Sequence, residues 1–228
     1  MTEQLAIAIA EPHTLQPSYN IAPTQETYIV DAVAHARRLR VVRWGLVPSW
    51  SRDTTGAARL INARSESITE KPSFKAAFAK RRCIIPMDGW YEWQGAGKQP
   101  WYMSMRDGRL ATVAGIYEHW RPANADPANP ASWVHTNAVI TTSPSADVAH
   151  VHDRMPVLIA HEDIDAWLDP ETPLHEVQHL LHPAPAGLVQ AWRVARLVSQ
   201  VRNNGAQLIE PLDPAAAAPS VEQPGLWE

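Results

Sequence analysis

Short runs of β-branched and aromatic residues, separated by turn residues, make up most of the chain. Such runs are typical of β-strands, and the lack of regular helices between them argues against a doubly wound parallel sheet. The pattern predicts an α+β domain that is mainly antiparallel β, with a barrel-like core and a few short helices. The expected strands are residues 27–33, 39–47, 81–86, 89–94, 100–105, 110–120, 135–142 and 189–198.

Apolar residues recur at helical spacing in three later segments, residues 73–81, 161–168 and 174–181. This spacing predicts three short helices, and residues 3–10 also read as a short helix. The Arg-Asp-Gly turn at residues 106–108 predicts a hairpin between the strands on either side of it.

The chain has 228 residues, which is enough for one full-sized core. We therefore expect a single domain over residues 1–212. The remaining stretch, DPAAAAPSVEQPGLWE at 213–228, has the composition of a disordered tail.

The charge and cysteine content narrow the class of protein. A formal charge of −4 and a pI near 6.2 argue against a largely positive surface that binds duplex DNA. They are compatible with a local basic groove. The single cysteine, Cys83, and the lack of a basic-then-apolar leader favour a reducing cytoplasm. The early apolar run at residues 5–10 is too short to cross a bilayer, so no membrane insertion is expected.

Tryptophan is unusually frequent, with ten Trp against five Tyr and two Phe. Core packing alone does not require this imbalance, because Phe and Leu fill cores without an indole N–H that needs a partner. Most of these rings are expected to pack in the core or against turns, while some are candidates for stacking platforms.

Two polar pairs could carry chemistry. In INAR, Asn62 and Arg64 would point to the same side of a strand, and in HDRMP, His152 and Arg154 would do so if that segment is extended. Each pair sets a short polar or proton-carrying group beside a guanidinium, as a site for a phosphate-bearing substrate would need. Taken alone, each pair is better explained by an exposed polar face.

Glu92 is the third candidate. It lies between Tyr91 and Trp93 in a predicted strand, with Trp90 close by in the sequence. Burial of a carboxylate among aromatic rings raises its pKa, which suits it to proton transfer near neutrality. The alternative is a strand-end glutamate that faces water.

Other chemistries are poorly supported. His150 and His152 form an H-x-H pair without a cluster of further ligands, so neither a metal nor a cofactor is expected. Cys83 lies in an apolar strand, where a thiol is usually inert. The chain has no phosphate-binding glycine loop and no G-x-S-x-G motif.

Seven strings in this order resemble the SOS response-associated peptidase family, whose members process abasic sites in DNA. The resemblance runs from about residue 19 to residue 211. The strings are SYNIAPTQ, RWGLVPSW, LINARSES, RRCIIPMDGWYEW, AGIYE, ITTSPSADVAHVHDRMPV and VRNNGAQLIEP.

The resemblance implies a DNA-binding protein with covalent chemistry. It implies binding to single-stranded DNA, or to a junction of single and double strand, at an abasic site. In the family the initiator methionine is removed, and the exposed cysteine condenses through its amine and thiol with the sugar aldehyde to form a thiazolidine crosslink. A peptidase activity on the protein's own terminus and a lyase activity are implied as well. The expected protein is a cytoplasmic monomer that associates with the nucleoid through DNA.

The resemblance also assigns roles to individual residues. Glu92 and His152 would be the acid/base pair that moves protons, and Asn62 would hold the sugar or the terminal amine. Arg64, Arg154 and Thr141 look like phosphate ligands. Trp50 and Pro23 look like the wedge that stacks on bases beside the lesion, and Trp44 is expected to contact DNA as well.

The start of the chain departs from the family pattern. The family begins Met-Cys-Gly-Arg, whereas this chain begins Met1-Thr2-Glu3-Gln4. Cys83 cannot substitute, because the condensation needs an amine and a thiol on one terminal residue. We expect a truncated start, and the alternative is a homologue that binds single-stranded or junction DNA without crosslinking it. A hydrolase of unrelated small substrates, using Glu92 and His152, is a third interpretation.

Overall fold

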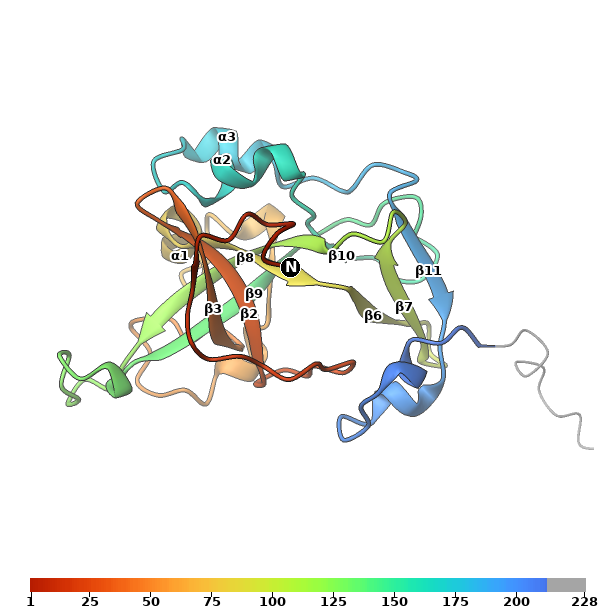
Figure 1. The fold of residues 1–228 in the computed structure, drawn as a ribbon, viewed down its shortest axis with the longest axis horizontal. Coiled ribbons are helices and arrows are strands. Elements are labelled where there is room, and N and C mark those ends of the chain that lie inside the picture. Colours follow the sequence, from red (N-terminus) through yellow and green to blue (C-terminus); the bar gives the residue numbers. More distant parts are fainter. Residues whose placement is uncertain (213–228) are drawn as a thin grey trace, which may run out of the picture.

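The computed structural model describes residues 1–212, and the predicted disordered tail lies outside the described residues. Strands dominate, as the sequence predicted, and the fold is α+β with a barrel-like core (Figure 1). Five strands close a mixed barrel. They are β2 (Glu26–Val33), β3 (Ala36–Trp44), β5 (Arg82–Met87), β8 (Ala111–Trp120) and β9 (Val134–Thr142).

Four pairings in the barrel are antiparallel and one is parallel. The strands run in the order β3-β2-β5-β8-β9 through antiparallel ladders. A short parallel pairing then joins β3 back to β9, with Arg43 opposite Thr136 and Trp44 opposite Asn137. Closure leaves few free strand edges. Three short strands add to the barrel, namely β1 (Ile9–Ala10) on β3, β4 (Asn62–Arg64) on β9 and β10 (Met155–Pro156) on β9.

A separate antiparallel sheet of three strands stands beside the barrel, at the right in Figure 1. Its order is β11-β7-β6. A buried apolar cluster joins the barrel to this sheet, because Ile29 and Val139 of the barrel belong to the same cluster as Trp90 and Met103 of the sheet. The strands are β6 (Gly89–Gln94), β7 (Gln99–Met105) and β11 (Val189–Arg193).

Three short α-helices pack against the barrel through a second buried cluster. Trp167 of α2 is fully buried, and its indole N–H donates to the Cys83 carbonyl oxygen at 2.8 Å. The helices α1 (Lys75–Lys80), α2 (Ile164–Leu168) and α3 (Leu174–His179) lie within the three segments predicted to be helical. Short 3₁₀ turns occupy Ala57–Arg59, Ser65–Ser67, Pro130–Ser132, His161–Asp163, Arg196–Ser199 and Ala206–Leu208.

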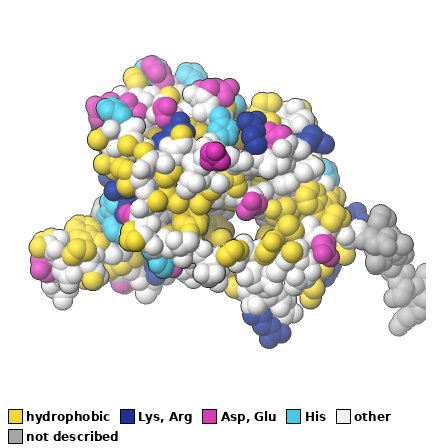
Figure 2. Space-filling view, viewed as in Figure 1, with side chains coloured by type: hydrophobic (Ala, Val, Ile, Leu, Met, Phe, Trp, Pro, Cys, Tyr) yellow, Lys and Arg dark blue, Asp and Glu magenta, His cyan; other side chains and the backbone are white. Residues whose placement is uncertain are grey.

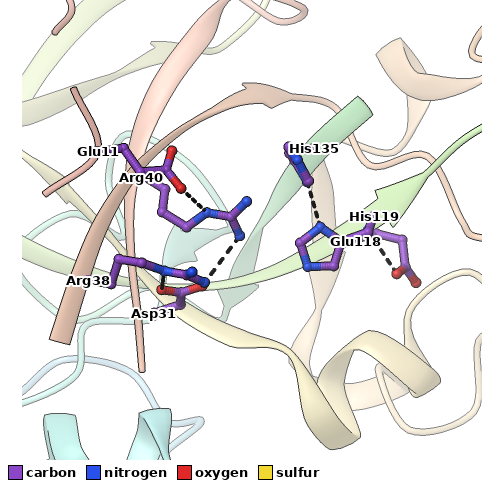
Figure 3. A network of polar contacts seen from close by, with 7 residues as sticks. All are labelled: Glu11, Asp31, Arg38, Arg40, Glu118, His119 and His135. Atoms are coloured by element: carbon purple, nitrogen blue, oxygen red, sulfur yellow. Dashed lines mark hydrogen bonds and ion pairs between the residues drawn. The ribbon is translucent and has the colours of Figure 1, made fainter. Parts of the chain in front are cut away.

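A buried charge network ties the first strands together (Figure 3). Asp31 is 1% exposed and accepts hydrogen bonds from Arg38 at 2.9 and 2.6 Å and from Arg40 at 3.4 Å. Arg40 in turn donates to Glu11 at 2.9 Å. Two guanidinium groups therefore compensate a carboxylate that would be costly to bury alone.

Two histidines face each other across β8 and β9 (Figure 3). His119 and His135 are opposite in the ladder, and their Nδ1 atoms are 2.5 Å apart. Burial lowers the pKa of His119 to about 4, with the neighbouring His135 adding to the effect. The pKa of His135 is lowered as well, chiefly by burial. The pair therefore stays uncharged near neutral pH.

Three details of the sequence prediction were wrong. Residues 3–10 form turns followed by the edge strand β1, not a helix. The turn at residues 106–108 exists, but β7 and β8 lie in different sheets and do not form a hairpin. The last predicted strand is shorter, because β11 ends at Arg193 and a 3₁₀ turn follows.

Within residues 1–212, no helix combines the length and the apolar character needed to cross a membrane.

Candidate functional site

A cavity of about 470 Å³ opens beside the three-stranded sheet. It is lined by Glu92 and Trp93 of β6, Lys98 of the following turn, His152 and Ser199. The Trp93 indole N–H donates to the Ser199 hydroxyl at 3.1 Å, which links the sheet to the segment after β11. Figure 2 shows that the surface is hollowed between the barrel and this sheet. The structure thus brings Glu92 and His152 into one cavity, as the sequence predicted.

The Glu92 carboxylate is strongly affected by its surroundings. Its side chain is 22% exposed, and Oε2 lies 3.9 Å from Nδ1 of His152. Burial raises the pKa of Glu92 to about 7, His152 opposes this rise and Asp153 adds to it. Trp101 lies directly opposite Glu92 on β7, so an indole supplies part of the apolar surroundings. Glu92 can therefore both donate and accept a proton near neutrality.

His152 is placed by a turn, not by a strand. The segment before β10 is irregular, so the extended conformation considered for His152 and Arg154 is not adopted. The Arg154 backbone N–H donates to Nδ1 of His152 at 3.0 Å. In the neutral ring this leaves the proton on Nε2. The imidazole is thus oriented by the backbone of the next residues and remains accessible at the cavity.

Three short segments bring the predicted phosphate ligands together. In β4, Asn62 and Arg64 are exposed and flank the buried Ala63, which confirms that they share one face. Arg64 lies opposite Thr141 in the parallel β4–β9 ladder. Thr141 also accepts a hydrogen bond from Arg154, at 2.6 Å to its backbone oxygen. Arg64, Thr141 and Arg154 therefore meet at the end of β9.

Glu66 is a partner that the sequence reasoning did not single out. Its carboxylate accepts two hydrogen bonds from the Arg154 guanidinium, at 2.7 and 2.9 Å. The Arg154 hydrogen bond lowers the pKa of Glu66 to about 2. The only sequence signal is its place in LINARSES, two residues after Arg64.

The three residues predicted to contact DNA by their rings lie in different surroundings. The Trp44 indole N–H donates to the Ile61 oxygen at 3.0 Å, so Trp44 packs against the residue before Asn62. The Trp44 oxygen accepts from the Thr24 N–H at 2.8 Å, which brings the exposed Pro23 to the same end of β3. Trp50 is 66% exposed. Its ring is thus available for stacking, but no hydrogen bond in the described chain ties it to the cavity.

A loop contact that sequence reasoning missed holds one wall of the site. The Asn20 amide donates to the backbone oxygens of Val198, Gln200 and Asn203 at 3.0, 3.2 and 3.1 Å. The adjacent Tyr19 N–H donates to the Asn204 side chain at 2.7 Å. The strings SYNIAPTQ and VRNNGAQLIEP, far apart in sequence, therefore contact each other. Both strings contain asparagine, and this is the sequence signal that could have indicated the contact.

The described residues hold no cluster of three or more His, Cys, Asp or Glu side chains suited to a metal ion. Cys83 is fully buried, and burial raises the pKa of its thiol well above the ordinary value. It lies in the core, as expected for an inert thiol.

Comparison with known sequences decides the family. A family model described as SOS response associated peptidase (SRAP) matches residues 1–201. The chain belongs to the SRAP family. Abasic site processing protein YoaM of Bacillus subtilis is 38% identical to it, over 86% of this chain and 85% of the relative. Abasic site processing protein HMCES of Gallus gallus is 32% identical, over 87% of this chain and 67% of the relative.

Solved structures share the SRAP fold of this chain. A crystal structure of a protein from Bacteroides thetaiotaomicron matches with a TM-score of 0.72 and 26% identity, covering 83% of this chain and 82% of that one. A protein from Bordetella bronchiseptica matches with a TM-score of 0.68 and 24% identity, covering 86% of this chain and 96% of that one.

Proposed function

We propose that the protein processes abasic sites in single-stranded DNA, or at junctions of single and double strand. The observation that carries this proposal is the partly buried Glu92 beside His152 in an open cavity, in a chain of the SRAP family. Relatives named abasic site processing proteins support the same substrate. The exposed Arg64 and Asn62 on one face of β4 provide a guanidinium for a backbone phosphate and an amide for the sugar.

Glu92 and His152 act as the acid/base pair. An amine that condenses with the ring-opened sugar aldehyde loses protons, and the aldehyde oxygen must leave as water. A carboxyl with a pKa of about 7 can give the proton to that oxygen and take one from the amine. His152 lies 3.9 Å away and can exchange protons with the same groups.

The crosslinking step depends on a terminal cysteine. In a thiazolidine, the amine and thiol of one residue bond to the same aldehyde carbon, and one water is released. Cys83 is buried and has neither access to DNA nor a terminal amine, so it cannot take this role. A second candidate, which needs no accessible cysteine, is a protein that binds single-stranded or junction DNA without forming a covalent product.

The test uses an abasic single-stranded oligonucleotide and two forms of the protein. We expect the chain that begins with Thr2 to bind without a stable adduct. A form preceded by Met-Cys-Gly-Arg should give an adduct that survives denaturing electrophoresis. In that form, Glu92→Gln and His152→Ala should each slow adduct formation by about 100-fold, while the exposed His175→Ala serves as control.

The outcomes separate the candidates. No adduct with the extended form, together with retained affinity for DNA, would leave only the non-covalent binder. Unchanged rates in both active-site variants would remove Glu92 and His152 from the mechanism.

A further inference from the structure

The Arg154 guanidinium, predicted from the sequence to be a phosphate ligand, is already occupied by a carboxylate of the same chain. Nη1 donates to Oε1 of Glu66 at 2.7 Å, and Nη2 donates to Oε2 at 2.9 Å. This two-bond pairing uses the end of the guanidinium fork, which is also an edge on which a phosphate would be bound by two hydrogen bonds.

The other donors of Arg154 offer little to a phosphate. The second hydrogen of Nη2 is directed to the Thr141 backbone oxygen at 2.6 Å. Nε is buried and has no hydrogen-bond partner within residues 1–212. Of the five N–H bonds of the guanidinium, three are used, the one on Nε is buried, and one on Nη1 remains. A phosphate can be held by two bonds at the fork only after Glu66 has moved away.

The two partners differ in their freedom to move. The Arg154 side chain is 19% exposed and is anchored by Thr141, whereas the Glu66 side chain is 56% exposed. The pKa of Glu66, about 2, keeps its carboxylate ionised at neutral pH, so acid does not open the pair under ordinary conditions. An incoming anion is therefore the agent that can exchange with Glu66.

We propose that Glu66 is an internal competitor for DNA phosphate at Arg154, displaced when a strand enters the cavity. This inference rests on the proposed function, because it takes DNA as the incoming anion. Competition of this kind weakens binding to the phosphates of any DNA strand. It therefore favours strands that gain further contacts in the cavity, such as those with an abasic site.

The test measures the affinity of the full chain for an abasic single-stranded oligonucleotide at fixed low salt. We expect Glu66→Gln to bind about two- to fivefold tighter, because the competing charge is gone. Glu66→Asp keeps the charge but shortens the arm, and should also bind tighter than the unsubstituted protein. Glu70→Gln removes a charge from an exposed position four residues away in sequence and should change the affinity by less than about 1.5-fold.

A double-substitution cycle with Arg154→Gln assigns the effect to this pair. In that background Glu66→Gln should no longer improve binding, and thermal unfolding verifies that each variant is folded. Weaker or unchanged binding of Glu66→Gln would overturn the proposal, as would a gain that persists without Arg154. Absence of DNA binding by the unsubstituted protein would instead reject the proposed function as well.

Discussion

Glu92 illustrates how one side chain acquires its chemistry from its neighbours. It lies in a strand with Trp101 opposite and His152 close to its carboxylate. Burial destabilises the charged form, and this effect is larger than the attraction of His152. The same burial that raises the pKa of Glu92 must cost stability when the group ionises.

The pH dependence of stability should expose this cost. The pKa of Glu92 is raised from 4.5 to about 7, so between these values the unfolded chain releases the proton before the folded one does. The unsubstituted protein therefore loses stability as pH rises through this window. Glu92→Gln should be more stable by on the order of 2 kcal/mol above pH 7, with the gap closing toward about pH 4.

Urea unfolding of both proteins across this pH range measures the gap. His175→Ala, at an exposed titratable residue, controls for changes in the free energy of unfolding that would follow the removal of any titratable group. A difference that is constant with pH would mean that Glu92 is not the titrating group.

At the scale of elements, the contact between residues 18–25 and residues 198–204 holds one side of the site. Asn20→Ala removes the amide that donates to three backbone oxygens and should cost about 1–3 kcal/mol. Asn20→Asp should cost more, because it sets a carboxylate without donors among carbonyl oxygens. Chemical denaturation gives both values.

Asn204→Ala is the matched comparison for this contact. It removes a single hydrogen bond, from the Tyr19 N–H, and should cost about 1 kcal/mol. Equal losses in the Asn20 and Asn204 variants would show that the three-carbonyl contact adds no stability of its own.

Element types could be predicted from local pattern, whereas pairing could not. The runs that became β2, β5, β8 and β9 carry their β signal in neighbouring residues. Leu5, Ile7 and Ile9 alternate as in a strand, but the edge of β3 with which Ile9 pairs is not visible in the sequence, so the helix predicted over residues 3–10 is wrong. The Arg-Asp-Gly sequence predicts the turn correctly. Which sheet each flanking strand, β7 or β8, joins depends on the whole fold.

The site was predictable only in its chemistry-bearing residues. Glu92 stood out because a carboxylate among aromatic residues is unusual. Glu66 did not, since an exposed glutamate becomes informative only when Arg154, distant in sequence, is found beside it. The roles of Glu92, His152, Arg154, Trp50 and Pro23 in DNA processing are all still predictions.

At the scale of the whole molecule, a formal charge of −4 must be reconciled with binding a polyanion. Under the proposed function, attraction comes from local groups such as Arg64 and Arg154, not from the overall field. Two phosphate contacts predict a slope of about −1.4 in a plot of log affinity against log salt concentration for single-stranded DNA. Arg64→Ala should reduce the slope by about 0.7.

Fluorescence anisotropy over a salt series measures these slopes. Lys75→Ala, at an exposed position of α1, is a control that should leave the slope unchanged. A slope near zero would mean that backbone phosphates are not bound.

The parallel contact of β3 with β9 has a consequence for how the chain is made. Arg43 pairs with Thr136 and Trp44 with Asn137, and these partners lie about 90 residues later in the chain. The barrel therefore cannot close until β9 has been synthesised and has left the ribosome. Until then the end of β3 that pairs with β9 has unpaired backbone groups, which another chain could bind by edge-to-edge pairing.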